Sequence, residues 1–390
     1  AAAGALTMEI ESVFARAFSS LDALLAPLLA GRWWFLRVGA LAITLSLVFH
    51  SPSRPIGYHW ALQVLQQQVD HPLTPLQPWK YNPRVSPVDD GIASHLDKLT
   101  FRLTIPILGK IFHTGVRSWL IFSGLAGVVF YPLFAVLCER WLKNRQTVLY
   151  LTAAFAISWT GRQFFDDYGL GDGVAWFFLL LSVASRRPLF IFFSVLAAAF
   201  TDERGLIASA GTFLFWAMGD ENVQTGKAEV STAVWSRWKQ KGAVAAAWLV
   251  YLGMRYYLGS KFGLKTGNSM MWNPQVVVYN LQNSIPYSAL AVFEGLWPWL
   301  LFGFVSLLVD RRYLAAGGYA GIYLLLGAIA LVVWDFQRTL AYSLVLFPLA
   351  WRARGLQPQN ALFVSRLVFL LGLALVTPWE TPLRYLRFLR

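Results

Sequence analysis

Long apolar runs separated by short polar breaks dominate this sequence, and they constrain its fold more than any other feature. The clearest runs cover residues 118–137, 174–183, 243–252, 289–309 and 362–376. In hydrocarbon every backbone N–H and C=O group must find a partner within the protein, so such runs form helices or closed barrels. These runs are continuous and do not alternate between apolar and polar residues, which favours helices over a barrel.

The composition agrees with this interpretation. Hydrophobic residues make up 57% of the 390 residues and charged residues only 14%, whereas a soluble domain carries about 25% charged residues. We therefore predict an all-α, polytopic integral membrane protein with about ten or eleven transmembrane helices. The predicted spans cover residues 33–50, 118–137, 147–159, 173–184, 188–200, 205–218, 243–258, 286–309, 314–333, 339–351 and 362–376.

The basic residues predict an orientation. With these spans, five basic clusters fall on the same side as the N-terminus: Arg140 with Lys143 and Arg145, Arg186 with Arg187, Arg237 with Lys239 and Lys241, Arg311 with Arg312, and Arg352 with Arg354. The positive-inside rule assigns that side to the cytoplasm. The same bias explains the net charge of +13, so we expect no nucleic acid partner. The predicted location is the plasma membrane, which is the inner membrane of a bacterium, with a cytoplasmic N-terminus.

The predicted organisation is one transmembrane domain after a short N-terminal segment. Residues 1–32 form the cytoplasmic segment, which contains an amphipathic helix suited to the membrane surface, and residues 33–390 form the transmembrane domain. Two outer loops, 51–117 and 259–285, are too long to be simple connections. In the first loop we predict helices at residues 58–69 and 92–112. The second of these helices carries a basic stripe and is expected to kink at Pro106.

Acids and bases in the first outer loop are the first candidate site. The residues are Asp89, Asp90, Asp97, His95, Lys98 and Arg102. A carboxylate there can take a proton from an attacking hydroxyl or orient it, while Lys and Arg can hold a phosphate. Alternatively, the Asp89-Asp90-Gly91 sequence is a solvated turn and its acids cap a helix.

A second candidate is the acidic, glycine-rich connection at residues 162–173. Asp166 and Asp167 are candidate ligands for a divalent cation such as Mg²⁺ or Mn²⁺, although such a site needs further oxygen ligands from elsewhere. Asp172 stands at the start of the next span and is expected to serve as its N-cap. The alternative is that the whole connection is structural.

Three more candidates lie at the predicted outer ends of spans. Asp202 and Glu203 interrupt two apolar runs, and there Arg204 either neutralises Glu203 or leaves it free to bind a substrate. Arg338 is a candidate partner for a phosphate or a carboxylate, and the alternative is an ion pair with Asp335 at helical spacing. Glu294 lies several residues inside the predicted span 286–309. An intramembrane acid is a functional candidate, unless it only extends towards the interface.

The order of these features resembles that of the polytopic glycosyltransferases of the C-type fold (GT-C), which use lipid-phosphate sugar donors. A first span precedes a long outer loop with acids and amphipathic helices, and many spans with short polar breaks follow. Residues 94–106, 202–204 and 335–338 also look like segments of uncharacterised bacterial membrane proteins related to that fold. The resemblance rests on this order and not on a tight motif.

The resemblance implies a catalytic acid at Asp89 or Asp90, with Asp97 as the rival, and a carrier phosphate held by Lys98, Arg102 and Arg338. One departure is that the first acid after the first span is Asp70. The leading hypothesis is a transferase that moves a sugar from a polyprenyl-phosphate donor to an acceptor on the outer, periplasmic face. The alternatives are a non-catalytic scaffold or anchor bound to partner membrane subunits and, third, a transporter. The expected partners are the lipid bilayer and a lipid-phosphate carrier.

Overall fold

The protein is all-α in the part of the chain that the computed structural model describes, and no strand occurs there. The described residues are 16, 18–49, 66–75, 98–165, 171–218, 227–264, 274–285, 289, 292–333, 335–351 and 358–375. The helices that correspond to predicted spans are α2 (Trp34–Phe49), α6 (Ser118–Leu142), α7 (Arg145–Ile157), α9 (Asp172–Ala184), α10 (Pro188–Thr201), α11 (Glu203–Ala217), α12 (Lys227–Phe262), α15 (Trp297–Val309), α16 (Tyr313–Leu331), α17 (Phe336–Ala341), α18 (Leu346–Trp351) and α19 (Pro358–Leu375). Every predicted span therefore overlaps a helix.

Two of these helices are long and apolar enough to cross a membrane, over Ile121–Leu142 and Tyr313–Leu331. The other apolar helices among the described residues are shorter, such as Pro188–Thr201 and Asn360–Leu375.

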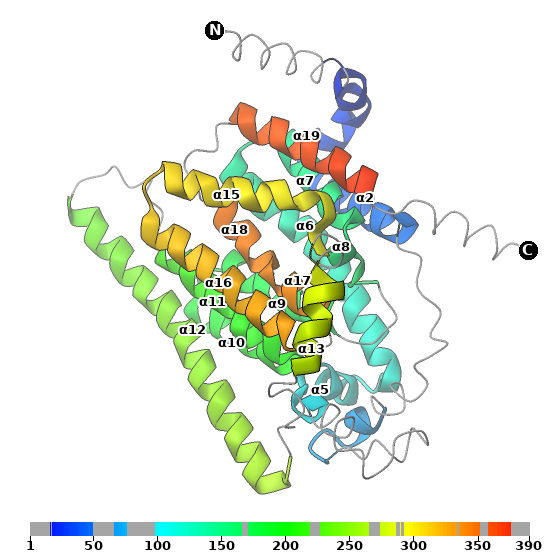
Figure 1. Ribbon diagram of the computed structural model, residues 1–390, viewed down its shortest axis with the longest axis vertical. Helices are drawn as coiled ribbons and strands as arrows, with labels where there is room; N and C mark the ends of the chain where they lie inside the picture. Colours follow the sequence, from blue (N-terminus) through cyan, green and yellow to red (C-terminus); the bar gives the residue numbers. More distant parts are fainter. Residues whose placement is uncertain are drawn as a thin grey trace, which may run out of the picture.

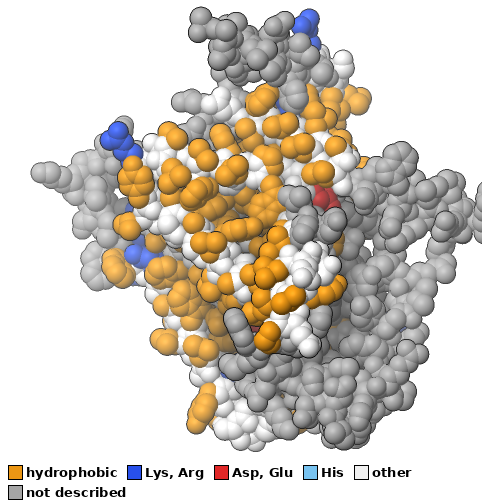
Figure 2. Space-filling view, viewed as in Figure 1, with side chains coloured by type: hydrophobic (Ala, Val, Ile, Leu, Met, Phe, Trp, Pro, Cys, Tyr) orange, Lys and Arg blue, Asp and Glu red, His pale blue; other side chains and the backbone are white. Residues whose placement is uncertain are grey.

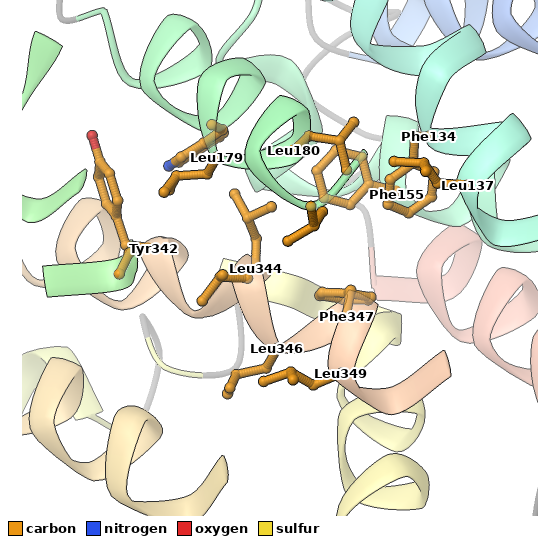
Figure 3. Close-up of a cluster of buried hydrophobic side chains, with 14 of the residues drawn as sticks. Phe134, Leu137, Phe155, Leu179, Leu180, Tyr342, Leu344, Leu346, Phe347 and Leu349 are labelled. Carbon is orange, nitrogen blue, oxygen red and sulfur yellow. The ribbon is translucent and has the colours of Figure 1, made fainter. Parts of the chain in front are cut away.

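The core lies where α6, α7, α9 and the α17–α18 segment meet. From Thr147 to Ile157 every side chain of α7 is buried. Aromatic rings fill the contact between α6 and α7, since Phe130 and Phe134 both stack on Phe155. Figure 3 shows Phe155 and Phe347 with leucines from α9 and from the segment that leads into α18. Burial of such side chains stabilises a fold by about 1.5–3 kcal/mol each in water, and in lipid the close packing itself takes over that role.

The basic connections that the structure describes lie at one end of the helices, as the alternation of the spans predicts. Arg140 at the end of α6 donates to the carbonyl of Ala184 at the end of α9. Gln240 of α12 donates to the carbonyl of Arg186 in the α9–α10 connection. Arg312, between α15 and α16, donates to the carbonyl of Met218 after α11. In Figure 1 the short helix α5 (Thr104–Ile111) lies near the opposite end of the molecule.

Three predicted elements of the outer segments differ from the structure. The helix predicted at 92–112 is not continuous in its described part, because a 3-10 turn η2 (Lys98–Phe101) precedes α5. Pro106 is the third residue of α5 and not a mid-helix kink, and proline is tolerated in a first turn, where N–H groups have no helical partner. The loop predicted at 259–285 is partly helical, because it contains α13 (Pro274–Tyr279) and a π-helical turn η4 (Asn280–Ser284).

Two further predicted helix boundaries also differ from those in the structure. α12 has 36 residues and extends well beyond the predicted span at both ends. Glu294 was predicted several residues inside the span 286–309, whereas in the structure it begins the 3-10 turn η5 (Glu294–Leu296) that leads into α15. Hydropathy predicts neither boundary, because it reports the length of an apolar run and not the length of the helix that contains it.

The N-terminal helix Phe18–Leu29 packs on α7 and α19 through the side that carries Phe18 and Asp22. Asp22 accepts hydrogen bonds from Tyr150 of α7, at 2.5 Å, and from Arg366 of α19. Arg37 donates to the carbonyl of Pro27 near the end of this helix. The predicted amphipathic segment is thus helical in its described part, and its acid Asp22 pairs with side chains of the protein.

Candidate functional site

A cluster of buried charges lies at the end of the helices opposite the basic connections. Its members come from four places: the residue after η2, the start of α9, the α10–α11 junction, and α17 with the residue before it. They are Arg102, Asp172, Asp202, Glu203, Arg204, Asp335 and Arg338, which we call the charge network. It contains three guanidinium groups and four carboxylates.

Asp202 is the centre of the network and is fully buried. It adopts an extended backbone between α10 and α11, and its side chain caps α11 by accepting from the backbone N–H of Arg204 at 3.0 Å. The Arg204 guanidinium adds two hydrogen bonds, at 2.7 and 2.8 Å, one to each carboxylate oxygen. Arg102 approaches from the η2 side with its Nη2 2.9 Å from Asp202 Oδ2. One carboxylate thus joins two cations.

Asp172 is the second buried carboxylate, and its partners come from α17 and the turn after it. Arg338 Nε donates to Asp172 Oδ2 at 2.6 Å, and the hydroxyl of Tyr342 donates to Oδ1 at 2.9 Å. Arg204 Nη2 lies 3.7 Å from Asp172 Oδ1, while Arg338 Nη2 lies 3.8 Å from Asp202 Oδ2. These longer contacts connect the two buried acids into one network.

Glu203 and Asp335 form the more accessible edge of the network. The Glu203 side chain is 26% exposed, and its contacts with Arg102 are long, at 3.4 Å. The Asp335 side chain is 41% exposed and accepts from Arg338 Nη1 at 2.7 Å. Glu203 is therefore the network carboxylate with the longest contacts to its cation.

Gly171 allows Asp172 to reach this position. It has φ of +73° and precedes the first residue of α9, a backbone conformation that favours glycine. A Cβ atom at this position would lie 2.7 Å from the Trp119 ring. The structure therefore corrects the expected cap: Gly171 occupies the N-cap position, and Asp172 is the first helical residue.

The electrostatics of Asp202 follow from these contacts. Burial opposes its ionisation, but the positive charges of Arg102 and Arg204 outweigh burial and hold the pKa of the Asp202 carboxyl well below its usual value. A carboxylate of this kind is a poor proton acceptor near neutral pH. The chemistry that this network favours is the binding and orientation of charged or hydroxyl groups, with arginine forks as the donors.

The structure brings together Arg102, Asp202, Glu203, Asp335 and Arg338, five of the predicted site residues. Arg102 was predicted on a surface stripe, but it is buried inside the network. Glu294 lies in a different environment, because η5 packs on α19 and Gly295 contacts Gly372. Lys98 is in η2, where only its backbone is described. The remaining candidates, Asp89, Asp90, His95, Asp97, Asp166 and Asp167, lie outside the described residues.

Sequence reasoning missed the roles of two members of the charge network and of one tyrosine that contacts it. Asp172 was interpreted only as a cap, although it is one of the three acids in its connection. Arg204 was expected, on the structural alternative, to neutralise Glu203, yet it forms its bidentate contact with Asp202. Tyr342 lies in an apolar run and carried no signal of its own.

A divalent cation does not fit the described part of the network. Mg²⁺ and Mn²⁺ need carboxylate oxygens that are free to coordinate, whereas Asp172 and Asp202 already accept from arginines. Among the described residues no group of three or more His, Cys, Asp and Glu side chains has the arrangement of a metal site. Comparisons with protein-family models, with curated proteins and with solved structures found no match to this chain.

Proposed function

We propose that the protein is a polytopic membrane glycosyltransferase of the GT-C type, located in the plasma membrane of a bacterium. It would transfer a sugar from a polyprenyl-phosphate donor to an acceptor on the outer face. The observation that carries the proposal is the convergence of Arg102, Asp202 and Arg338 at one end of the helices, from segments far apart in the chain. Arginine forks of this kind suit a phosphate.

The surface supports the membrane part of the proposal. Large apolar side chains are exposed on the outer helices, among them Leu125 and Val128 of α6, Leu189 and Phe193 of α10, Leu249 and Leu252 of α12, Leu301 and Val305 of α15, and Leu314 and Leu324 of α16. Hydrophobic side chains cover much of the described surface in Figure 2, over α15 and α16. A soluble monomer rarely exposes so large an apolar area, so lipid is the natural solvent for this face.

The ion pairs of the charge network suggest a different role for each residue of the proposed site. Asp172 and Asp202 are engaged by arginines, so they would hold the arginines in place and not remove a proton. The acceptor hydroxyl would be activated by Asp89 or Asp90, as the resemblance implies. Glu203, at the accessible edge, would contact a hydroxyl group of a bound sugar.

One observation favours the second candidate, a non-catalytic scaffold. All four network carboxylates contact an arginine, which is the arrangement expected of a network that only holds helices together. The apolar surface would then be shared with partner subunits. Activity measurements separate the two candidates.

The experiment compares the protein with the double variant Asp89→Asn/Asp90→Asn in membrane vesicles that contain radiolabelled polyprenyl-phosphate sugars. We expect the wild type to release sugar from the carrier and the double variant to lose most of this activity, because general acid–base groups contribute about 10²–10⁴-fold. Asp70→Asn is the matched control, since Asp70 lies in the same loop, is exposed and contacts Gln66. Equal activity of the double variant and wild type would refute the catalytic assignment, and no release by the wild type would favour the scaffold.

A further inference from the structure

Arg255 of α12 is a cation beside the charge network that differs from the network arginines. Its Nη1 donates to the hydroxyl of Tyr251 at 2.9 Å, and its guanidinium carbon lies 4.5 Å from the centre of the Phe101 ring. Among the described residues no carboxylate lies within ion-pair distance of Arg255. Each network arginine, in contrast, contacts at least one carboxylate.

Arg255 lies where buried aromatic side chains meet exposed apolar side chains of α12. The Arg255 side chain is half-buried, while Phe101 and Tyr251 on either side of it are buried. Tyr251 contacts Phe200, which is two residues before Asp202. Arg255 follows Tyr251 by one helical turn, so it lies close to the level of the network. An arginine held by two aromatic rings and one hydroxyl keeps most of its N–H donors for another acceptor.

The apolar surface next to Arg255 continues along α12. Leu252 and Leu249 come three and six residues earlier and are 54% and 72% exposed. At 1.5 Å per residue they lie about 5 and 9 Å deeper along the helix. Arg255 is seven residues from Phe262, the last residue of α12, or about 10 Å from the helix end. In the membrane location proposed above, Arg255 would then lie near the headgroup boundary, with the exposed leucines where acyl chains would lie.

We propose that Arg255 binds the phosphate of an anionic phospholipid at this edge, with Phe101 and Tyr251 fixing the guanidinium and Leu252 contacting an acyl chain. The proposal rests on the membrane location proposed above but not on the transfer reaction. A half-buried arginine without a carboxylate is costly at the surface of a bilayer, and a headgroup phosphate would supply the negative charge. A lipid resident at this position would seal the side of the network between η2 and α12.

The test is lipid retention by the full chain. The protein is reconstituted in nanodiscs of phosphatidylcholine that contain a small fraction of phosphatidylglycerol, and the lipids that remain after exchange into detergent are identified by mass spectrometry. We expect phosphatidylglycerol to be enriched on the wild type. Arg255→Gln should reduce the enrichment by about tenfold, which corresponds to the loss of one charge-assisted hydrogen bond. Arg255→Lys should keep part of it, because the positive charge remains.

Lys261→Gln is the matched control, because Lys261 is a cation on the same helix that contacts Tyr257. It should retain the wild-type enrichment. The proposal is overturned if Arg255→Gln binds phosphatidylglycerol like the wild type, if the wild type shows no enrichment, or if Lys261→Gln loses it equally. A third arm adds polyprenyl phosphate and, separately, inorganic phosphate, and displacement of phosphatidylglycerol by either would assign the site to that ligand.

Folding is checked in parallel by the thermal unfolding midpoint in detergent. If Arg255→Gln does not fold, Tyr251→Phe replaces it, since this change keeps the ring and removes only the hydroxyl that holds Arg255. Tyr251→Phe should then lower the enrichment, and an unchanged enrichment overturns the proposal. No sugar transfer is measured in these experiments, so their outcome is separate from that of the activity test.

Discussion

Arg338 and Asp172 are 166 residues apart in the chain, and their side chains meet at 2.6 Å between Nε and Oδ2. The contact joins the start of α17 to the start of α9. Because Asp172 also accepts from Tyr342, four residues beyond Arg338, two side chains of one segment hold the same carboxylate. This pair therefore links α17 and the turn after it to the start of α9.

The first prediction concerns this pair. Asp172→Asn and Arg338→Met should each lower the free energy of unfolding by up to about 3–5 kcal/mol, because each removes the buried partner of a buried charge. Only the contact of Arg338 with the more exposed Asp335, or the long contact of Asp172 with Arg204, then remains. The double variant should lose less than the sum, with a coupling energy of about 1–3 kcal/mol. Unfolding of the four proteins in detergent measures the cycle. Strictly additive losses would mean that the two residues act independently.

The second prediction ranks the two acids of the α10–α11 junction. Asp202→Asn should be strongly destabilising, by about 3 kcal/mol or more, because two arginines lose the carboxylate that neutralises them. Glu203→Gln should cost less than about 1 kcal/mol, since its side chain is 26% exposed and its contacts are 3.4 Å long. The thermal midpoints of the two variants should separate clearly, and the reverse order would contradict the assignment of Asp202 as the centre.

The sequence predicts the helices well and the charge network only in part. Apolar runs locate helices because lipid and core both require apolar side chains, so even α7 and α10 were found at nearly their observed bounds. The alternation of spans also predicts that Asp202 and Arg338 lie on one side, and the structure brings them into one network.

The sequence does not predict which charged side chains form ion pairs with one another. Which arginine meets which acid depends on distances between segments a hundred or more residues apart, as for Arg102 and Glu203. Neighbours in the chain suggested that Arg204 neutralises Glu203, but the extended backbone at Asp202 turns the Asp202 carboxylate towards Arg204. Helix ends such as Glu294 were also misplaced, because hydropathy does not report where a helix begins.

The third prediction tests the backbone at the start of α9. Gly171→Ala should be destabilising by about 1–3 kcal/mol, because its positive φ disfavours alanine and the new methyl group would meet Trp119. Gly317→Ala in α16 is the control, since no atom lies within 4 Å of a Cβ at that position. It should be neutral or slightly stabilising, because alanine favours helices. Equal thermal midpoints for the two variants would show that Gly171 has no special role.

The fourth prediction concerns acid stability. The pKa of Asp202 is lowered in the folded protein from an ordinary value of 3.8, because its arginine partners outweigh its burial. The stability from this group is therefore fully present above the ordinary pKa and is lost as the pH falls towards the folded-state pKa. The unfolding midpoint should drop when the pH is lowered from about 5 to about 3. Asp202→Asn should show a smaller drop, and an identical pH profile would exclude this carboxylate as the cause.

The fifth prediction tests the proposed orientation with single cysteines. The native Cys138 is fully buried and should react little with a membrane-impermeant maleimide. Ser260 is exposed near the end of α12, whereas Arg187 is exposed just before α10 at the basic end. In intact cells Ser260→Cys should be labelled at once, and Arg187→Cys only after the membrane is permeabilised, because the basic end faces the cytoplasm. The opposite pattern would invert the topology and place the charge network on the cytoplasmic side, where an outward-facing transferase could not use it.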